Sequence, residues 1–426
     1  MTTKHIASIF VFCLCIVALQ AQNFVAQELG VKYRCRVIDA QLRQAEVESV
    51  EMLTDSLVDV RFPEWVRYKG VRYALVSARG GLFRNNTHVR SLTTGVNMRY
   101  VGSSICRGCK NLRWVSLGTG LKELGRGAFA LCFGLDSVSY NAIDCHVDQA
   151  NSDVWLGCYN LRRLHLGDSV RAIPERFMLS CSALDCELHL PQSLRVIGAW
   201  AFDDCSNLRG KLIFPPRLDS ISSSAFAGMN SIDTLVIQSR LLQIPSDEHL
   251  VFYHSINPVD VIVDSQVIAL PTCIFNRFYG MRSLQLPNHL EVLPAQMCIY
   301  DSNLHQIRLP DSLRIIGRSA FYECGLQHIE VPAQTVMIEN YAFAYNNNLA
   351  EVTMGQSIKF IGDYVFVADS ALRTVTMLSP EPPRIFEHTF GELDLDLITI
   401  LVPLGSVQAY RRDPLWNRFP NIKENL

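Results

Sequence analysis

The sequence contains none of the short motifs that mark the common enzyme classes. We find no G-x-S-x-G nucleophile motif, no H-E-x-x-H zinc-protease motif and no phosphate-binding loop. The glycine-rich stretch 118–127 follows the register of a repeat rather than a turn from strand to helix. Paired carboxylates such as Glu351 and Asp363 do not stand out from ordinary loop charges. The sequence therefore predicts a protein that is not an enzyme, with no catalytic residues and no cofactor.

The sequence also lacks an excess of charge of either sign. Its 39 Lys and Arg residues nearly balance 41 Asp and Glu residues, for a formal charge of -2. Such a balance gives no electrostatic footprint for nucleic acid or for an anionic membrane. Hydrophobic residues make up 49% of the chain and charged residues 19%, which argues for an ordered, well-buried protein.

Beyond the first residues, no apolar run reaches the roughly 20 residues needed to span a membrane. The first 21 residues combine Lys4, an apolar run from Ile6 to Leu19, and Ala21. This pattern is typical of a secretory signal peptide cleaved near Ala21; a membrane anchor is the alternative, for which the run is short. We expect a chain that is exported, with the mature protein secreted, periplasmic or on the cell surface.

The most informative feature is an internal repeat. The stretch Leu309–Leu326 repeats Leu190–Leu208, 119 residues earlier, at eleven positions. Self-similarity at a fixed spacing indicates a solenoid. An anchor residue recurs every 22 to 26 residues, which makes about 14 units. The anchors are Phe83, Cys106, Phe129, Trp155, Phe177, Phe202, Phe226, Phe252, Phe275, Cys298, Phe321, Phe343, Phe366 and Phe390; the units of Trp155 and Phe252 keep the spacing but lose most of the pattern.

Most units also contain an L-x-x-L-x-L segment, such as Leu304, Ile307 and Leu309. Alternation over its last residues predicts a half-buried strand. One strand per unit cannot bury its own apolar face, but parallel stacking of neighbouring units can. Gly125, Gly198, Gly317 and Gly362 suit a tight turn where a side chain would clash. The predicted fold is a β-rich solenoid of leucine-rich repeats with parallel strands.

The pattern L-P-x-S-L-x-x-I-G-x-x-A-F-x-x-C-x-x-L resembles the BspA-like leucine-rich repeat family of bacterial secreted and surface proteins. The end of the chain, from Val402 through Tyr410, Trp416 and Ile422, also resembles the terminal segment of that family. The resemblance implies the fold, export and a binding or adhesive role. It supplies no catalytic residues, and the fixed Asn of the commoner leucine-rich repeat is missing.

We expect four parts along the chain. Residues 1–21 form the signal peptide, residues 22–80 a β-rich N-terminal cap, residues 81–400 the solenoid and residues 401–426 a short C-terminal cap. The N-terminal cap is predicted from apolar alternation with β-branched and aromatic residues. Terminal units of a solenoid need such atypical covers. At the C-terminus, Ser406–Arg412 is expected to form one or two helical turns that place Tyr410 and Trp416 over the last turn.

Twelve cysteines remain after the leader. Five of them, Cys109, Cys132, Cys158, Cys181 and Cys205, precede the first strand leucine by three residues, while Cys324 falls one residue off this register. We interpret them as a ladder of buried thiols, because free Cys packs as a small hydrophobe. Disulfides between neighbouring turns are the alternative. The only C-x-x-C, Cys106 and Cys109, occupies an anchor and a ladder position and predicts no metal site.

The residues between the strand leucines are expected to form one exposed sheet. In the first half of the array they include the aromatic and Arg residues favoured at interface hot spots. The candidate partner-binding residues are Trp114, Arg163, His165, His189, Lys211 and Arg308. His165 and His189 share an outward position in adjacent units, but without a third ligand they predict no metal.

Two functions remain open at this point. The first is an exported binding or adhesion protein whose partner is a host or microbial extracellular protein or a glycan. The alternative is a structural or scaffolding component of the cell envelope without a specific foreign ligand. Self-association would favour the second function, and a monomer that binds a foreign protein would favour the first.

Overall fold

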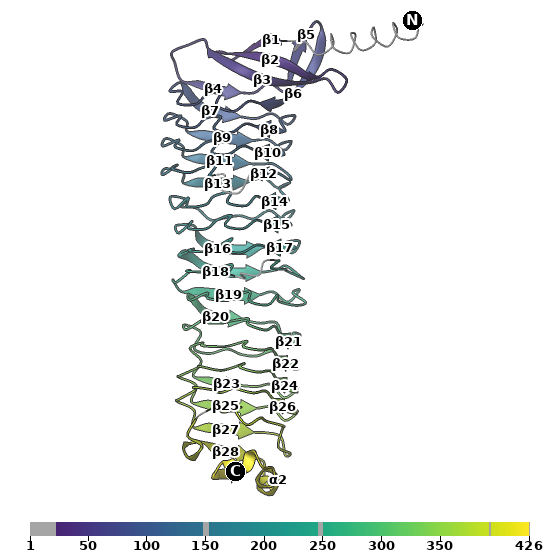
Figure 1. The fold of residues 1–426 in the computed structure, drawn as a ribbon, viewed down its shortest axis with the longest axis vertical. Helices are drawn as coiled ribbons and strands as arrows, with labels where there is room; N and C mark the ends of the chain where they lie inside the picture. Colours follow the sequence, from purple (N-terminus) through teal and green to yellow (C-terminus); the bar gives the residue numbers. More distant parts are fainter. Residues whose placement is uncertain (1–22, 148–152, 246–249, 392, 426) are drawn as a thin grey trace, which may run out of the picture. The chain divides into compact units, whose positions relative to one another are not determined.

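The computed structural model describes residues 23–147, 153–245, 250–391 and 393–425. The chain is a parallel β-solenoid of about 15 turns with almost no helix, which confirms the predicted fold class. It divides into two compact units between Asn160 and Leu161. Within each unit, short strands stack turn upon turn (Figure 1). The expected signal peptide lies outside the described residues.

The first unit contains two sheets. One has the order β1-β2-β3-β6-β8-β10-β12 with β5 beside β6, and the other contains β4, β7, β9 and β11. The strands of the first sheet are β1 (Asn23–Glu28), β2 (Val31–Asp39), β3 (Gln44–Met52), β5 (Trp65–Tyr68), β6 (Val71–Ala78), β8 (Tyr100–Val101), β10 (Glu123–Leu124) and β12 (His146–Val147). Those of the second are β4 (Val58–Arg61), β7 (Val89–Thr93), β9 (Trp114–Leu117) and β11 (Ser137–Tyr140).

The β-rich region before the first anchor forms strands as the alternation predicts. Strands β1, β2 and β3 pair antiparallel, and β3 then pairs parallel with β6. The ring of Phe62 lies between those of Tyr33 and Phe83, with centroids 5.9 and 6.3 Å away. This region therefore packs its aromatic core directly onto the first anchor of the repeat.

The second unit contains the remaining strands and the three short helices. Its long-strand ladders are β16-β18-β19-β20 and β23-β25-β27-β28-β29, and its two-residue strands form β14-β15-β17 and β21-β22-β24-β26. The longer strands are β13 (Arg163–Leu166), β16 (Arg209–Phe214), β18 (Ser231–Ile237), β19 (Val259–Val263), β20 (Met281–Gln285), β23 (His328–Glu330), β25 (Glu351–Met354), β27 (Thr374–Met377), β28 (Thr399–Val402) and β29 (Asn421–Glu424).

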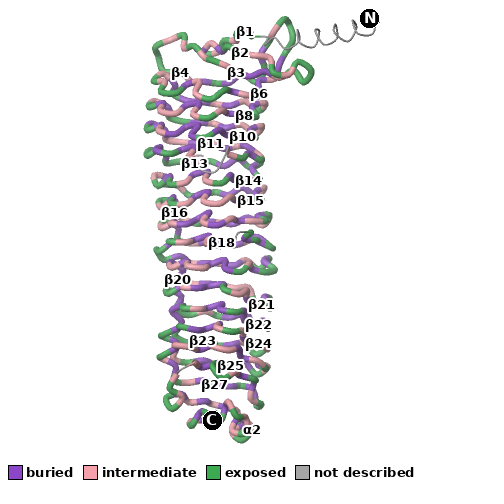
Figure 2. The backbone as a smooth tube through the Cα atoms, viewed as in Figure 1, coloured by how far each residue is buried: buried purple, intermediate pink, exposed green. Residues whose placement is uncertain are grey.

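The shorter elements of the second unit are two-residue strands and short helices. The strands are β14 (Ala172–Ile173), β15 (Val196–Ile197), β17 (Ser220–Ile221), β21 (Val292–Leu293), β22 (Ile315–Ile316), β24 (Met337–Ile338) and β26 (Phe360–Ile361). The helices are η1 (Leu395–Leu397), α2 (Val407–Arg412) and η2 (Trp416–Arg418). The two-residue strands contain a second group of apolar residues in each repeat, such as Ile315 and Ile316 of β22. Buried residues recur in every turn (Figure 2).

The anchors hold neighbouring turns in register through both backbone and side chain. The N–H of Phe321 donates to the carbonyl of Ala342, the residue before the next anchor, at 2.8 Å. The rings of Phe321 and Phe343 stack with centroids 5.6 Å apart. The two anchors with weak sequence patterns behave in the same way: Trp155 stacks on Phe129 at 4.8 Å, and Phe252 stacks on Phe226 at 6.1 Å. The predicted spacing is therefore correct at both.

Glycine is required where two turns approach each other closely. A Cβ atom at Gly317 would stand 2.7 Å from the carbonyl oxygen of Leu293, and one at Gly198 would stand 2.4 Å from the amide nitrogen of Glu175. Real Cβ atoms essentially never come so close to backbone atoms. The neighbouring turn, rather than the φ angle, excludes a side chain at these positions.

In several turns the residue three positions after the anchor points into the core and donates a hydrogen bond to the preceding turn. The thiols of Cys109 and Cys132 donate to the carbonyls of Phe83 and Cys106 at 2.9 and 3.0 Å. The thiol of Cys324 donates to the carbonyl of Cys298 at 2.7 Å. The expectation that Cys324 falls off the cysteine register is therefore wrong. The loop between Cys324 and Leu326 is one residue shorter than the loop between Cys205 and Leu208. Counting back from the strand leucine therefore misplaces Cys324, whereas counting forward from the anchor does not.

The cysteines fit the interpretation as buried thiols. No disulfide joins any cysteine of the described ranges. Burial raises the pKa of Cys106 and of Cys205 well above the ordinary thiol value, which keeps both groups protonated. A protonated thiol can donate to a carbonyl, as the ladder requires. The redox state of the cysteines in the protein stays a prediction.

The C-terminal cap covers the last turn with two aromatic side chains. Tyr410 of α2 and Trp416 of η2 are fully buried. The Tyr410 hydroxyl donates to the carbonyl of Ser379 at 2.9 Å, and the indole N–H of Trp416 donates to the carbonyl of Pro383 at 2.8 Å. This confirms the expected role of the terminal helical turns. Among the described residues, no helix has the length and apolar character needed to cross a bilayer.

One ladder position holds a carboxyl group instead of a thiol. Asp301 is fully buried, and neither of its carboxyl oxygens has a hydrogen-bond partner. Burial raises the pKa of Asp301 well above the ordinary carboxyl value. In the equivalent place two turns later, Asn346 donates its amide to the carbonyl of Phe321 at 2.8 Å. An amide therefore suits this position better than a carboxylate does.

We predict that Asp301→Asn raises the free energy of unfolding at pH 7 by about 1–3 kcal/mol, the cost of an unsatisfied buried polar group. Because the folded pKa is raised, the stability that the protonated Asp301 contributes is present at low pH and is lost as the pH rises. The gain should therefore shrink between pH 7 and pH 4 in urea unfolding. Asp233→Asn, at an exposed position of β18, is the control. An equal gain at both pH values would contradict this account.

Candidate binding surface

The exposed side chains of the strands form columns that run from turn to turn. In the first unit, Trp114 lies between Ser91 and Ser137, its partners in β7 and β11. The Trp114 side chain is 43% exposed. Both neighbours in the column are small, so the indole stays uncovered. The structure thus places Trp114 on the exposed strand face, as the sequence predicts.

The other five candidate residues lie in the second unit, and all are exposed: Arg163, His165, His189, Lys211 and Arg308. The first four come from three consecutive turns, and Arg308 lies four turns further along. The side chain of His189 is 84% exposed and approaches Glu187 at 3.7 Å. Exposure is therefore confirmed, and partner binding stays a prediction. Among the described residues, no group of three or more potential ligands is arranged to hold a metal.

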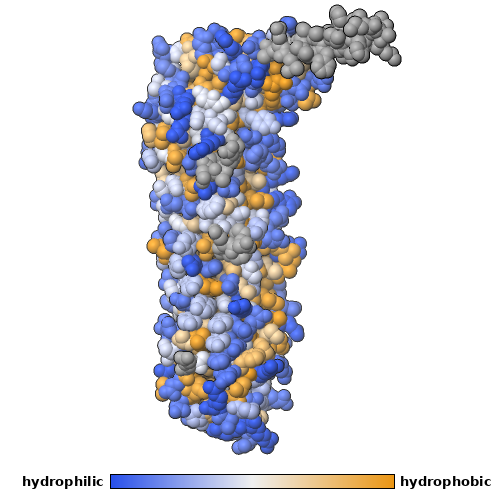
Figure 3. Space-filling model, viewed as in Figure 1, coloured by the Kyte–Doolittle hydropathy of each residue, from blue (hydrophilic) through white to orange (hydrophobic). Residues whose placement is uncertain are grey.

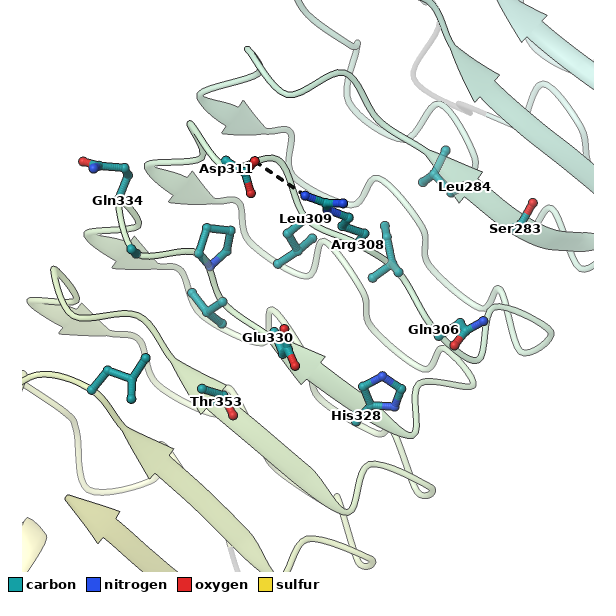
Figure 4. Close-up of a pocket in the computed structure, with 15 residues that line it drawn as sticks. Ser283, Leu284, Gln306, Arg308, Leu309, Asp311, His328, Glu330, Gln334 and Thr353 are labelled. Carbon is teal, nitrogen blue, oxygen red and sulfur yellow. Dashed lines mark ion pairs between the residues drawn. The ribbon is translucent and has the colours of Figure 1, made fainter. Parts of the chain in front are cut away.

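A groove of about 1040 Å³ lies on the strand face of the second unit. It extends over four consecutive turns, from β20 to β25 (Figure 4). Its polar lining residues are Ser283, Gln306, Arg308, Asp311, His328, Glu330, Gln334 and Thr353, and its apolar ones include Leu284, Ile307, Leu309 and Val331. Arg308 forms an ion pair with Asp311 at 3.7 Å. Of the six predicted residues, only Arg308 lines this groove.

The groove lies where the strand ladder is interrupted. Strand β20 pairs only with β19, and β23 pairs only with β25. The turn between them, residues 304–309, forms no strand, and no backbone hydrogen bond joins it to residues 281–285. The N–H groups of residues 305–309 donate to no protein acceptor in the described ranges. Ile307 is only partly buried, whereas the equivalent Ile329 is 1% exposed.

Proline contributes to this interruption, although it does not interrupt the ladder alone, since Pro403 follows β28 and β28 still pairs with β27. In regular turns, the residue after the last strand residue donates its N–H to the preceding turn, as Gln238 does to Phe214 and Leu378 does to Met354, both at 3.0 Å. Three successive turns here carry proline at the corresponding place in the repeat, directly after the last apolar residue of the L-x-x-L-x-L segment. They are Pro287, Pro310 and Pro332. Proline has no N–H to donate. The ladder therefore loses the same bond three times in a row.

A second interruption also lies beside prolines. Residues 186–190 also form no strand, and the adjacent turns carry Pro191 and Pro215 at the position after the last strand residue. His189 and Glu187 belong to this turn. The two copies of the motif that revealed the repeat, at Leu190 and Leu309, are thus the two turns of the second unit whose long strand is missing.

A hydrogen-bonded cluster fixes one wall of the groove. The carboxylate of Asp260 in β19 accepts from the Arg282 guanidinium, with Nε 3.1 Å away, and from the Ser283 hydroxyl at 2.6 Å. The hydrogen bond from Arg282 is the main cause that lowers the pKa of Asp260. Asp59 makes the same contacts with Arg90 and Ser91 in the first unit, and its pKa is lowered in the same way.

Sequence reasoning missed most of the groove. It placed most candidate residues in the first half of the array and named none of Asp311, His328 and Glu330 as candidates. Their side chains look ordinary in any one repeat. The available signal was the run of prolines in consecutive turns, which predicts a weakened ladder at one place in the sheet.

Comparisons with known proteins agree with the repeat pattern. Residues 79–209, 186–297 and 295–410 match the family described as BspA type leucine rich repeat region, with six copies of its repeat. The match covers more than half of the chain. A comparison with curated proteins finds no match.

Several solved structures are similar in fold. A leucine-rich repeat protein from Bacteroides ovatus ATCC 8483 has a TM-score of 0.56 and 19% identity, over 89% of this chain and 99% of that one. The pneumococcal vaccine antigen PcpA has a TM-score of 0.43 and 15% identity, over 95% of this chain and 99% of that one. At these identities, the similarity to the Bacteroides ovatus protein shows the leucine-rich repeat fold alone. We draw no conclusion from the similarity to PcpA.

We predict that the Asp260 carboxyl titrates below its ordinary pKa of 3.8. Because the folded pKa is lowered, Asp260 contributes stability above this value, and the contribution is lost as the pH falls through the folded pKa. Carboxyl-carbon NMR across an acid titration measures the midpoint. In Arg282→Ala the midpoint should rise, because the main donor is gone. A midpoint that is the same in both proteins would refute the cluster.

Proposed function

The chain belongs to the BspA-type leucine-rich repeat family, and we propose that it is an exported binding protein that holds an extended segment of an extracellular partner protein in the groove between β20 and β25. Support for a surface role comes from the N-terminal sequence, which is typical of a signal peptide.

The observation that carries the proposal is the set of unpaired backbone groups in the groove. The N–H groups of residues 305–309 have no protein acceptor among the described residues. An extended peptide presents a row of carbonyls that can accept such donors, which is how strands are added to an open sheet. The side chains around them then choose the sequence of the peptide.

The lining of the groove favours a peptide of mixed charge. Arg308 and His328 stand beside Asp311 and Glu330, so neither sign dominates. Among the described residues that line the groove there is no Phe, Tyr or Trp, so no such ring is available there for a sugar to stack on. Leu284, Ile307 and Val331 offer apolar contacts at the base. A protein segment with alternating polar and apolar residues fits this chemistry better than a glycan.

The visible surface does not suggest a single large apolar interface. Hydrophobic residues appear in small groups separated by hydrophilic ones (Figure 3). Stable interfaces without a large apolar patch depend on a few well-placed anchors. In the groove, Arg308 and Glu330 are the residues expected to contribute most to the affinity for the partner.

The test uses a peptide library displayed as extended segments, with affinities measured on the mature chain. We predict that selected peptides lose roughly tenfold or more in affinity with Arg308→Ala or Glu330→Ala, as for hot-spot residues. Thr376→Ala, on β27 outside the groove, should leave the affinity unchanged. If Thr376→Ala weakens binding as much as Arg308→Ala, the groove is not the site.

A second set of variants separates the groove from the rest of the strand face. Trp114→Ala, Arg163→Ala and Lys211→Ala remove the exposed residues predicted from the sequence. A partner that also contacts these turns should lose affinity with them. Binding that depends on these residues and not on Arg308 or Glu330 would overturn the groove as the main site and favour the strand face predicted from the sequence.

A further inference from the structure

The first unit contains a strongly basic stretch that the balanced total charge conceals. Residues 84–126 contain eight Lys and Arg residues and a single acidic residue, Glu123. Arg90 is neutralised by its ion pair with Asp59. The guanidinium groups of Arg84, Arg107 and Arg126 form no ion pair with any described residue. Within the described residues, these three arginines therefore carry positive charge that no ion pair neutralises.

These three arginines line one pocket of about 450 Å³, together with Ser103 and Ser104. They come from three consecutive turns of the repeat. Arg84 and Arg107 each directly follow an anchor, while Ser103 and Arg126 each follow the glycine after a two-residue strand. The pocket is thus built from loops on the anchor side of the turns, not from the long strands. Asp153 and Leu156 complete its lining with Gly127.

The floor of the pocket is open because Gly127 has no side chain. A Cβ at Gly127 would stand 3.5 Å from Nη1 of Arg107 and 3.9 Å from Oγ of Ser104. A guanidinium and a hydroxyl therefore converge on the same point above the glycine. Gly127 lies two residues before the anchor Phe129 with a φ of +57°. Trp200 and Ser319, at the same place in their own turns, carry side chains at a φ of +53°, so the missing side chain at Gly127 is what leaves this space free.

We propose that this pocket binds a tetrahedral oxyanion, as carried by a sulfate or phosphate monoester. Three guanidiniums on adjacent turns repel one another in the empty pocket, and an anion removes this repulsion. The planar fork of arginine matches two oxygens of such a group at once. The two serine hydroxyls add donors of the kind that oxyanions accept. Asp153 is the single acidic residue among the described residues that line the pocket, so the three arginines leave it with a positive balance.

This site is independent of the proposed peptide groove. It lies in the first unit and on loops, whereas the groove lies on the strand face of the second unit. The pocket indicates that the protein also recognises a negatively charged group, in addition to any peptide. A sulfate ester and a phosphate ester present the same tetrahedral oxyanion to the pocket, and the experiment below distinguishes between them.

Isothermal titration calorimetry on the full mature chain, at low ionic strength, tests the proposal. The probes are glucose 6-sulfate and glucose 6-phosphate, which differ only in the ester, with glucose and chloride as blanks. We expect saturable binding of at least one ester and none of the blanks. Arg107→Ala should weaken binding roughly tenfold or more, the effect of losing a hydrogen bond to a charged group. Arg84→Ala, at an exposed position, should weaken it without affecting folding.

Arg99→Ala is the matched control, because Arg99 is an exposed arginine of the same basic stretch outside the pocket. It removes the same charge and should leave the affinity almost unchanged. Arg107→Lys keeps the charge but loses the fork, and its affinity should lie between those of the native protein and Arg107→Ala. The proposal fails if neither ester binds above the blanks, or if Arg99→Ala weakens binding as much as Arg84→Ala and Arg107→Ala do.

Discussion

The structure depends on one constraint, which is that no turn of the repeat can bury its own apolar face. Each turn must be covered by the next, and the cover works only in register. The anchor N–H groups set that register, as from Phe321 to Ala342 at 2.8 Å. The residue three positions later bonds back to the preceding turn, as Cys324 does to Cys298. Core positions are therefore fixed by their neighbours, and only outward positions are free to vary.

The candidate site lies where this constraint is partly released. Proline at the end of the strand segment removes a backbone donor in three successive turns, and β20 and residues 304–309 are not paired. The two segments stay together at their ends, through Asn303 to the carbonyl of Tyr279 at 2.6 Å and through Ser312 N–H to Asn288 at 3.3 Å. The core beneath remains closed while backbone donors are exposed in the groove. A regular solenoid can thus present a polar groove without losing its register.

The regular parts of the fold could be predicted from the sequence, because the period of the apolar residues sets both the strands and the anchors. Trp155 and Phe252 are the clearest cases, since spacing alone placed them correctly. The place of Cys324 could not be predicted, because a deleted residue shifts the count from one end of the turn but not from the other. The groove was missed because Asp311, His328 and Glu330 are unremarkable in their own repeats. The basic pocket was missed because total charge averages over local excess.

Amide hydrogen exchange of the free protein, resolved by residue, tests the central claim most directly. That claim is that the parallel ladder is open at residues 304–309 and closed on either side. Protection reports whether a backbone N–H is hydrogen-bonded in a stable part of the fold. The account predicts fast exchange at residues 305–309 and slow exchange at Val352 of β25 and Leu235 of β18. Equal protection at residues 305–309 and at β25 would show a continuous ladder and contradict the account.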